Sequence, residues 1–523
     1  MRVAIQRRPA LVDLTQASFE NTFVRDLPAD PVHINMPRPV SDAAYTRVEP
    51  TPVAAPKLLA WSDAMGDLLG LSRPGQATLE VLAGNRVLSG MQPYAARYGG
   101  HQFGHWAGQL GDGRAITLGE LIATDGSRQE LQLKGAGKTP YSRTADGRAV
   151  LRSSVREFMC SEAMFHLGVP TTRALSLIGT GEAVIRDMFY DGHPAPEPGA
   201  IVCRVAPSFV RLGNFQILTA SDELDALRRL ADYVVREHFP GHDYAAWYQE
   251  VCRRTALLMV DWMRLGFVHG VMNTDNLSIL GLTIDYGPYG WIDNFDRDWT
   301  PNTTDAHGRR YRFGHQPRVA YWNLTRLAGA VATLFESIEP LEAGLQRYAD
   351  VFAAADRENI ARKLGLHECR DEDVESMQRL HELLEQGEID MTLFFRSLAE
   401  FDGDAPDLAV FDAAFYDPAK RVAIEASLRD WLVGYAARVR SEEAATAVRR
   451  SRMEAANPLY VLRNYLAQLA IDRAEQGDYD GVHELLDVMR RPYDAQPGRE
   501  RFAAPRPDWA RSRPGCSMLS CSS

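Results

Sequence analysis

Two segments in the middle of the chain contain residue types that could hold a metal ion beside phosphate groups. They are His269-Gly-Val-Met-Asn-Thr-Asp-Asn276 and Leu282-Thr-Ile-Asp-Tyr-Gly287. Mg²⁺ prefers hard oxygen ligands in an octahedron that it shares with phosphates, and an Asn amide and an Asp carboxylate can supply two of them. A single Asp or Asn in a turn is common and needs no function. Asn276 and Asp285 are therefore candidate metal ligands, and evidence for that role must come from other motifs in the sequence.

Lys134 and Glu157 form a second candidate pair. Lys134 follows an apparent strand, and Glu157 lies on the only helix that the pattern predicts in the same half of the chain. In kinases a strand lysine paired with a helix glutamate positions the phosphates of ATP. A structural interpretation remains open, because Ser154-Val-Arg-Glu157 also fits a capping box, in which Glu157 would only satisfy a backbone N–H.

The order of these elements favours the functional interpretation. On the kinase loop H-R-D-x-x-x-x-N, His269 and Asn276 fall in register, while Val271 takes the position of the catalytic Asp. Asp285-Tyr-Gly287 then stands where kinases have the metal-binding D-F-G motif. The sequence therefore predicts a nucleotide site with Mg²⁺ or Mn²⁺ that lacks the usual kinase base.

Three other motifs are weaker. Gly135-Ala-Gly-Lys-Thr139 resembles the end of a P-loop, but Gln132 replaces the required first glycine. His101-Gln-Phe-Gly-His105 has zincin spacing without the catalytic Glu, so we interpret it as a turn with polar side chains. The glycine-dense stretch from 98 to 113, followed by Arg114, is either a tight hairpin or a backbone cradle for phosphates.

The distribution of periodic segments predicts the fold class. Between about residues 91 and 215, β-rich runs bounded by glycine turns predict strands at 115–118, 129–133, 174–178, 183–186 and 200–205, with one helix at 154–167. From about 222 onward, apolar residues at three- and four-residue spacing predict helices at 222–239, 243–265, 319–336, 371–386, 418–440 and 458–476. This order predicts an α+β, protein-kinase-like two-lobed fold with a β-rich N-lobe and a helical C-lobe.

We divide the chain accordingly into four parts. Residues 1–90, with several prolines and a predicted helix at 56–71, form an N-terminal extension packed on the core. Residues 91–215 form the N-lobe, and 216–490 form the helical C-lobe with the catalytic and metal-binding loops. Residues 491–523, rich in Arg, Pro and Ser, are expected to be a flexible tail.

Composition and charge exclude several classes of protein. The 523 residues contain 58 Lys and Arg against 69 Asp and Glu, a net charge of -11, so a generic binder of nucleic acid or anionic membranes is not expected. We find no apolar run of about 18 residues and no signal peptide. Six sparse cysteines do not make a disulfide framework, which favours a reducing compartment and a cytoplasmic location.

At this point the sequence resembles a known family. The motifs Tyr98-Gly-Gly-His-Gln-Phe-Gly104, Gln109-Leu-Gly-Asp-Gly-Arg114, Leu133-Lys-Gly-Ala-Gly-Lys138, His269–Asn276 and Ile284-Asp-Tyr-Gly-Pro288 are similar to those of the SelO/YdiU family. The resemblance runs from about residue 10 to the C-terminal Cys-Ser-Ser. It implies a pseudokinase-like fold and transfer of AMP from ATP, with UTP as an alternative donor, to Ser, Thr or Tyr hydroxyls of target proteins. It also implies a nucleotide bound in a flipped orientation, with the α-phosphate facing the acceptor.

The resemblance further implies roles for individual residues. Asp275 would be the proton acceptor, Asn276 a metal ligand, and Asp285 a ligand of both metal and nucleotide. Glu157 would pair with Lys134. The implied nucleotide contacts are Gly111, Gly113, Arg114, Lys134, Asp146, Gly147, Arg204, Arg211 and Asp285. Without the resemblance, Arg204 and Arg211 would be interpreted as surface charges on a strand.

Two alternatives to nucleotidyl transfer stay open from the residues. One is ordinary transfer of the γ-phosphate, against which Val271 argues, and the other is a non-catalytic nucleotide-binding scaffold.

We expect a monomer. The resemblance implies a redox role for Cys521, but the stretch from Tyr286 to Pro317 contains no cysteine to pair with it, so we expect activity to respond weakly to reductant.

Overall fold

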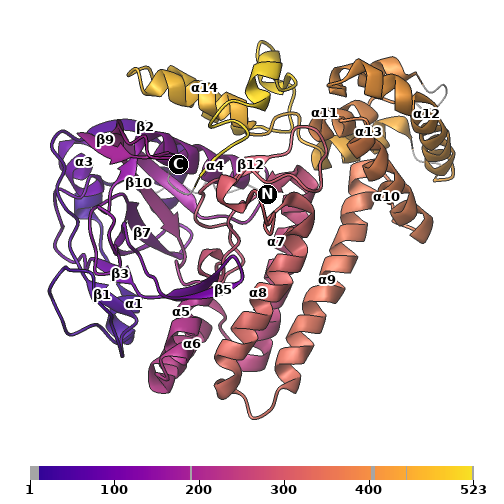
Figure 1. The fold of residues 1–523 in the computed structure, drawn as a ribbon. Helices are drawn as coiled ribbons and strands as arrows, with labels where there is room; N and C mark the ends of the chain where they lie inside the picture. Colours follow the sequence, from indigo (N-terminus) through magenta and orange to yellow (C-terminus); the bar gives the residue numbers. More distant parts are fainter. Residues whose placement is uncertain (1–10, 189–190, 402–406, 443–444, 521–523) are drawn as a thin grey trace, which may run out of the picture.

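An antiparallel sheet organises the first half of the chain (Figure 1). The computed structural model describes residues 11–188, 191–401, 407–442 and 445–520. Among these, eight strands form the main sheet in the order β1-β3-β6-β7-β10-β9-β2, with β8 paired to β10. The strands are β1 Tyr45–Arg47, β2 Lys57–Trp61, β3 Tyr94–Ala96, β6 Ala115–Ile122, β7 Arg128–Lys134, β8 Ala149–Val150, β9 Arg173–Arg186 and β10 Ala195–Ala206.

The central strands are buried on both faces. On β6 only Ile122 is exposed, and the five middle residues of β7 are buried. One face of the sheet packs on helix α4, Leu151–His166, through β9 and β10, and the other face covers a smaller apolar cluster that includes Ile116, Leu131 and Leu133. Strands enclosed in this way hold their side chains rigidly, and Lys134 stands at the end of one of them.

Two small hairpins lie outside the main sheet. Strands β4, Gly99–Gln102, and β5, His105–Gln109, pair with each other, as do β11, Phe267–Val268, and β12, Gly290–Trp291. The first hairpin contacts α5 and the short 3-10 helix η2, Thr274–Asn276. The second hairpin brackets the chain from 268 to 290, which contains most of the predicted catalytic residues.

The second half of the described chain is helical (Figure 1). Helices α7, α8 and α9 pack together, α10–α13 form a group at the right, and α14 and α15 pack on α4. Their bounds are α5 Leu212–Ala220, α6 Leu224–His238, α7 Tyr244–Leu265, α8 Gln316–Val331, α9 Glu339–Leu364, α10 Asp371–Gln386, α11 Met391–Leu398, α12 Pro418–Arg440, α13 Thr446–Ala456, α14 Asn464–Ala474 and α15 Asp480–Met489. Three short helices come before β3 along the chain, namely α1 Thr22–Asp26, α2 Asp63–Leu69 and α3 Gln76–Leu82.

The structure confirms the mixed α and β content and corrects several elements. The helix predicted at 56–71 is wrong, because Lys57–Trp61 forms edge strand β2 and the helix begins only at Asp63. The long helix α9 was missed because most of its residues between 342 and 358 are exposed or half-buried, which leaves a weak apolar stripe. The bounds predicted for 371–386 and 418–440 are those of α10 and α12.

The described part of the C-terminal segment packs on the rest of the chain, although we expected a flexible tail. Phe502, Ala510 and Leu519 are buried. The N–H of Leu519 donates to the carbonyl of Pro301 at 2.9 Å, and its carbonyl accepts from the N–H of Thr303 at 2.8 Å. Cys516 is buried, whereas Cys521 lies outside the described residues.

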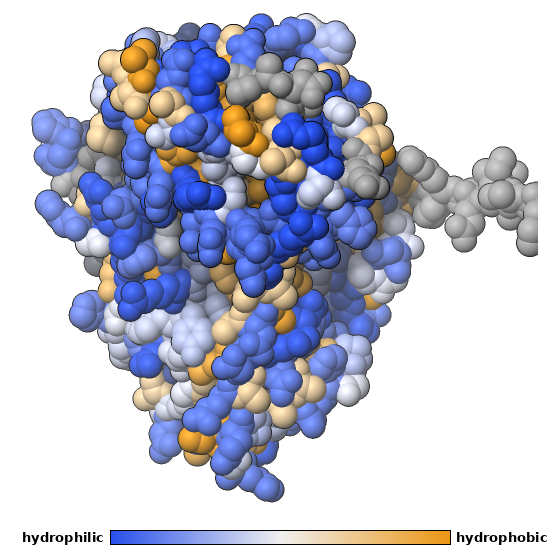
Figure 2. Space-filling view, turned by 90° about the vertical axis from the view of Figure 1, so that its right-hand side faces the viewer, coloured by the Kyte–Doolittle hydropathy of each residue, from blue (hydrophilic) through white to orange (hydrophobic). Residues whose placement is uncertain are grey.

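The surface over the helical half is mainly hydrophilic. In the view of this side, hydrophobic residues form only small scattered groups among polar ones (Figure 2). No helix within the described ranges combines the length and the apolar character that crossing a membrane requires.

Candidate active site

Strand β7 and helix α4 bring Lys134 and Glu157 together. The Nζ atom of Lys134 lies 2.7 Å from Oε2 of Glu157, and both side chains are largely buried. Burial lowers the pKa of Lys134 from its usual value, while Glu157 acts in the opposite direction. Helix α4 begins at Leu151, so Ser154 lies inside it and the capping-box interpretation of Glu157 is wrong.

Two buried arginines link this pair to Asp285. Arg204, on β10, donates to Glu157 Oε1 at 3.1 Å and to Asp285 Oδ1 at 2.5 Å. Arg211, the N-cap residue of α5, donates from Nη1 to the other oxygen of Asp285. Burial alone would raise the pKa of Asp285, but Arg211, Arg204 and Lys134 outweigh it and hold that pKa well below its usual range. The carboxylate is therefore ionised at neutral pH.

The backbone of Asp285 also has an unusual conformation. Its φ is +58°, in the left-handed region that costs a non-glycine residue free energy, although Asp tolerates it better than most. The residue before it is held in place, since the carbonyl of Ile284 lies 2.8 Å from Nε2 of His269, whose ring stacks on Trp262. His269 thus joins the two halves of the predicted catalytic region.

The loop after β11 and the helix η2 that follows it carry the next two residues, Val271 and Asn276. Asn276 donates from Nδ2 to the carbonyl of Val271 at 3.0 Å, which orients its Oδ1 away from that bond. Val271 itself is buried and apolar. Val271, at the position of the kinase base, therefore contributes an apolar side chain to the core and a backbone carbonyl that accepts from Asn276.

Asp275 is buried beside Asn276, and one of its carboxylate oxygens has no partner. Oδ2 accepts from Nε2 of Gln102 at 3.2 Å, whereas Oδ1 is buried without a hydrogen bond. Burial raises the pKa of Asp275 to about 6. A carboxylate with this pKa is mostly ionised at pH 7 and can accept a proton from a neighbouring hydroxyl.

The remaining predicted residues lie on two loops next to this network. A side chain at Gly111 would meet the ring of Tyr141 at 2.5 Å, and one at Gly113 would meet the carbonyl of Tyr141 at 3.0 Å. Arg114 follows directly, and burial lowers its pKa while Glu157 and Asp285 act to raise it. These glycines allow the chain to pass close to residues 139–142.

Asp146 and Gly147 lie on the loop that follows β7. A side chain at Gly147 would meet the carbonyl of Gly137 at 2.2 Å, so two backbone segments touch here. Asp146 pairs with Arg186 at 2.7 Å, and a hydrogen bond from Arg186 lowers its pKa. Asp146 is thus near the network but engaged by another arginine.

The donor set fits a divalent cation that shares its coordination with phosphates. Asn276 Oδ1 and the Asp285 carboxylate are hard oxygen donors, and a carboxylate already bonded to two arginines retains further lone pairs. No group of three or more His, Cys, Asp and Glu side chains that could hold a metal occurs within the described part of the chain. A cation here would therefore depend on phosphate and water for its other ligands.

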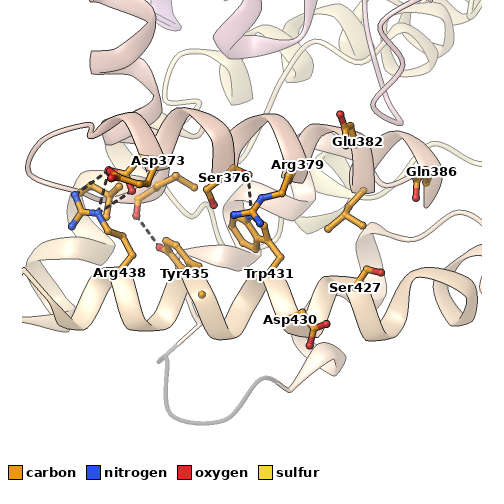
Figure 3. Close-up of a pocket in the computed structure, with 15 residues that line it drawn as sticks. Asp373, Ser376, Arg379, Glu382, Gln386, Ser427, Asp430, Trp431, Tyr435 and Arg438 are labelled. Atoms are coloured by element: carbon orange, nitrogen blue, oxygen red, sulfur yellow. Dashed lines mark hydrogen bonds and ion pairs between the residues drawn. The ribbon is translucent and has the colours of Figure 1, made fainter.

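A cavity of about 580 Å³ lies elsewhere, between α10 and α12 (Figure 3). Asp373, Trp431, Tyr435 and Arg438 are among its lining residues, and Asp373 pairs with Arg438 at 2.9 Å. None of the predicted site residues lines it. The cavity is separate from the network described above.

Sequence reasoning missed the neighbours of Asp275. Two hydrogen bonds join strand β4 to helix η2. Gln102 donates to the Asp275 carboxylate, and Thr274 Oγ1 accepts from the N–H of His101 at 2.7 Å. The polar side chains of His101-Gln-Phe-Gly-His105 were the only available signal. The partners lie 173 residues away along the chain, and spacing carries no information at that range.

Comparison with known proteins identifies close relatives. A family model described as "Protein adenylyltransferase SelO" matches residues 33–490. The chain is 61% identical over 519 residues to "Protein nucleotidyltransferase YdiU" of Xanthomonas axonopodis pv. citri (strain 306). The aligned region covers 98% of this chain and 100% of the relative. It is 62% identical over 514 residues to the protein of the same name from Azoarcus sp. (strain BH72), covering 97% and 99% respectively.

Proposed function

The chain belongs to the family of SelO protein adenylyltransferases, and we propose that it moves AMP from ATP to Ser, Thr or Tyr hydroxyls of target proteins. It is a protein nucleotidyltransferase, with ATP as substrate and proteins as acceptors. The observation that best supports the proposed chemistry is the unpartnered Oδ1 of Asp275 beside the network of Arg204, Arg211 and Asp285. UTP is the alternative donor.

The proposed kinase-like fold explains the placement of the binding groups. Lys134 on β7, Glu157 on α4 and the loops carrying Asn276 and Asp285 have the order and pairing of a two-lobed kinase. Arg204 and Arg211 add two guanidinium groups, which suit phosphate oxygens because their donors form a planar fork. We propose that these arginines and Lys134 hold the triphosphate with its α-phosphate toward Asp275.

In the proposed reaction the acceptor hydroxyl oxygen attacks the α-phosphorus. The bond between the α-phosphorus and the bridging oxygen breaks, pyrophosphate leaves, and the hydroxyl proton passes to Oδ1 of Asp275. Mg²⁺ or Mn²⁺ held by Asn276 and Asp285 would neutralise phosphate charge. Positioning and charge neutralisation supply most of the rate in such transfers, so the base has a smaller share.

The five described cysteines are all free thiols, which agrees with the proposed cytoplasmic location. We propose a monomer. Residues 216–490 are proposed as the helical lobe that carries both catalytic loops, and 91–215 as the lobe that carries Lys134 and Glu157.

The test of this function is the fate of each phosphate. After incubation with ATP labelled at the α- or the γ-phosphate, we expect only the α-label to become covalently attached to protein. Mass spectrometry should find an increment of AMP on Ser, Thr or Tyr. Attachment of the γ-label alone would contradict the proposal and support kinase chemistry, and ATP binding without any attached label would support the scaffold alternative.

A second prediction concerns Gly100. A methyl group at this position would lie 2.3 Å from Oδ1 of Asp275, the oxygen proposed to meet the acceptor hydroxyl. We expect Gly100→Ala to lower the rate of transfer about tenfold or more while the Kd for ATP stays unchanged, since displacing a catalytic group by a fraction of an ångström is costly. Gly329→Ala on α8 is the control, because that glycine does not have a left-handed φ and a methyl group there meets nothing within 4 Å. Equal rates for wild type and Gly100→Ala would contradict the role of Oδ1.

A further inference from the structure

The β4–β5 hairpin is fastened to the loop that carries Asp275. Its turn, Phe103-Gly104, has positive φ at both residues, +51° and +91°, as in a tight two-residue hairpin. The N–H of Phe103 donates to the hydroxyl of Tyr311 at 2.8 Å and to Asn273 Oδ1 at 3.3 Å. A strained turn persists only where surrounding contacts hold it, and here the contacts come from the catalytic loop and from the segment before α8.

The hairpin also packs aromatic side chains against aromatic and cationic side chains of α8 and of the segment before it. The ring of His101 lies 5.2 Å from that of Trp106 and 5.5 Å from that of Trp322 on α8. Arg310 and Arg326 lie over the Trp322 ring at 4.5 and 5.1 Å. We call these five residues the hairpin surface. Trp106 is 40% exposed, which is unusual for so large an apolar side chain.

The cations of the hairpin surface have one acidic neighbour, Asp305, which accepts a hydrogen bond from the backbone N–H of Arg310 at 2.9 Å; burial raises the pKa of Asp305, and the charge of Arg310 acts to lower it. Neither Arg310 nor Arg326 forms an ion pair with a carboxylate of the described residues, and Nε of Arg310 is buried without a hydrogen bond. The guanidinium of Arg310 lies against the turn, since a methyl group at Gly104 would be 3.4 Å from its central carbon. The protein as a whole has a net charge of -11, so two arginines without an ion pair over Trp322, which His101 connects to the exposed Trp106, form a local feature that the overall charge does not explain.

We propose that the hairpin surface binds the acceptor segment of the target protein, with a preference for Asp or Glu next to the modified hydroxyl. This inference rests on the proposed function, because it assumes that an acceptor hydroxyl meets Asp275. Gln102 connects the two, since it lies on the hairpin and donates to Asp275 at 3.2 Å. The backbone carbonyl of Asp275 accepts a hydrogen bond from Nη1 of Arg211, one of the proposed phosphate ligands.

The chemistry of the surface suits a polypeptide better than a nucleotide. Trp and Arg are among the residues that most often dominate binding at protein interfaces, and here two arginines lie over the ring of Trp322, which His101 connects to the exposed Trp106. The proposed phosphate ligands Arg204 and Arg211 are already grouped around Asp285. The side chains of Arg310 and Arg326 form no ion pair within the described residues, so they can bind carboxylates of an incoming segment.

The test uses two short synthetic peptides, one with a single Ser flanked by Asp and Glu and one with Asn and Gln in their places. We expect wild type to bind the acidic peptide more tightly and to transfer AMP to it with the higher kcat/KM. Arg310→Gln combined with Arg326→Glu should raise the Kd for the acidic peptide about tenfold, equivalent to about 1.4 kcal/mol, and remove the difference between the peptides. Trp106→Ala should weaken both peptides alike. The KM for ATP should not change in either variant.

Matched controls are available away from the site. Trp509→Ala removes another exposed tryptophan, and Arg347→Glu reverses an exposed charge on α9. Neither should change peptide binding. Unchanged preference for the acidic peptide in Arg310→Gln/Arg326→Glu would overturn the inference. If wild type binds the acidic peptide and the variant does not, the inference stands even where no α-label is transferred, in which case the proposed function alone fails.

Discussion

Transfer of AMP should fall by about three orders of magnitude when Asp285 is replaced by alanine, and ATP binding in the presence of Mg²⁺ should weaken. Asp285 is the only acidic group in contact with both Arg204 and Arg211 among the described residues, and it is a proposed metal ligand. Its removal eliminates the cation contact and leaves the two guanidinium groups without their shared counter-charge. Each lost charge-assisted contact to a transferring phosphate costs a few kcal/mol. Initial rates with α-labelled ATP measure the effect.

Loss of a buried carboxylate can also destabilise the fold, so the experiment needs a structural control. Removing one partner of a buried ion pair commonly costs about 3–5 kcal/mol. Asp390 forms a comparable buried pair with Arg463 at 2.8 Å, and none of its hydrogen bonds or ion pairs involves a predicted site residue. Asp390→Ala should lower the Tm but keep transfer at temperatures where the protein is folded. Asp285→Asn, which preserves the side-chain volume, should also lower the Tm because Arg211 loses its counter-charge, but unlike Asp390→Ala it should lose transfer even where the protein is folded. Near-normal turnover in Asp285→Ala would show that the metal assignment is wrong.

The elements of the fold were predicted best where periodicity was strong. Strands at 115–118 and 129–133 lie within β6 and β7, and the helices at 371–386 and 418–440 were placed within their observed bounds. These segments have a continuous buried face that fixes their pattern. The 57–61 segment was assigned to a helix because a short apolar run before a helical stretch does not distinguish strand from helix.

The candidate site was predictable to the extent that it is local in sequence. The kinase-like order of Lys134, Glu157, Asn276 and Asp285 could be recognised from motifs. Arg204 and Arg211 could not, since only the fold shows that a strand residue and a helix cap converge on Asp285. Gln102 was missed for the same reason, and no periodic pattern records which distant loop a turn contacts.

The second large effect is expected for Lys134→Met. Methionine keeps most of the apolar stem but removes the ammonium group, which lies 2.7 Å from Glu157. Glu157 would remain paired with Arg204 at 3.1 Å, so its charge stays compensated and the helix stays attached to the sheet. We therefore expect the kcat for transfer to fall about a hundredfold while the Tm changes little.

A buried lysine elsewhere separates the loss of a phosphate contact from the loss of packing. Lys363 is also buried, donates to the carbonyl of Arg264 at 3.0 Å and lies over the ring of Phe395. Lys363→Met should leave transfer unchanged, because none of its contacts involves the site. If Lys134→Met and Lys363→Met reduced transfer equally, the effect would be one of packing. If Glu157→Gln reduced transfer much less than Lys134→Met, the lysine would act on phosphate directly and Glu157 would serve to position it, because a neutral amide can still accept one hydrogen bond from Lys134.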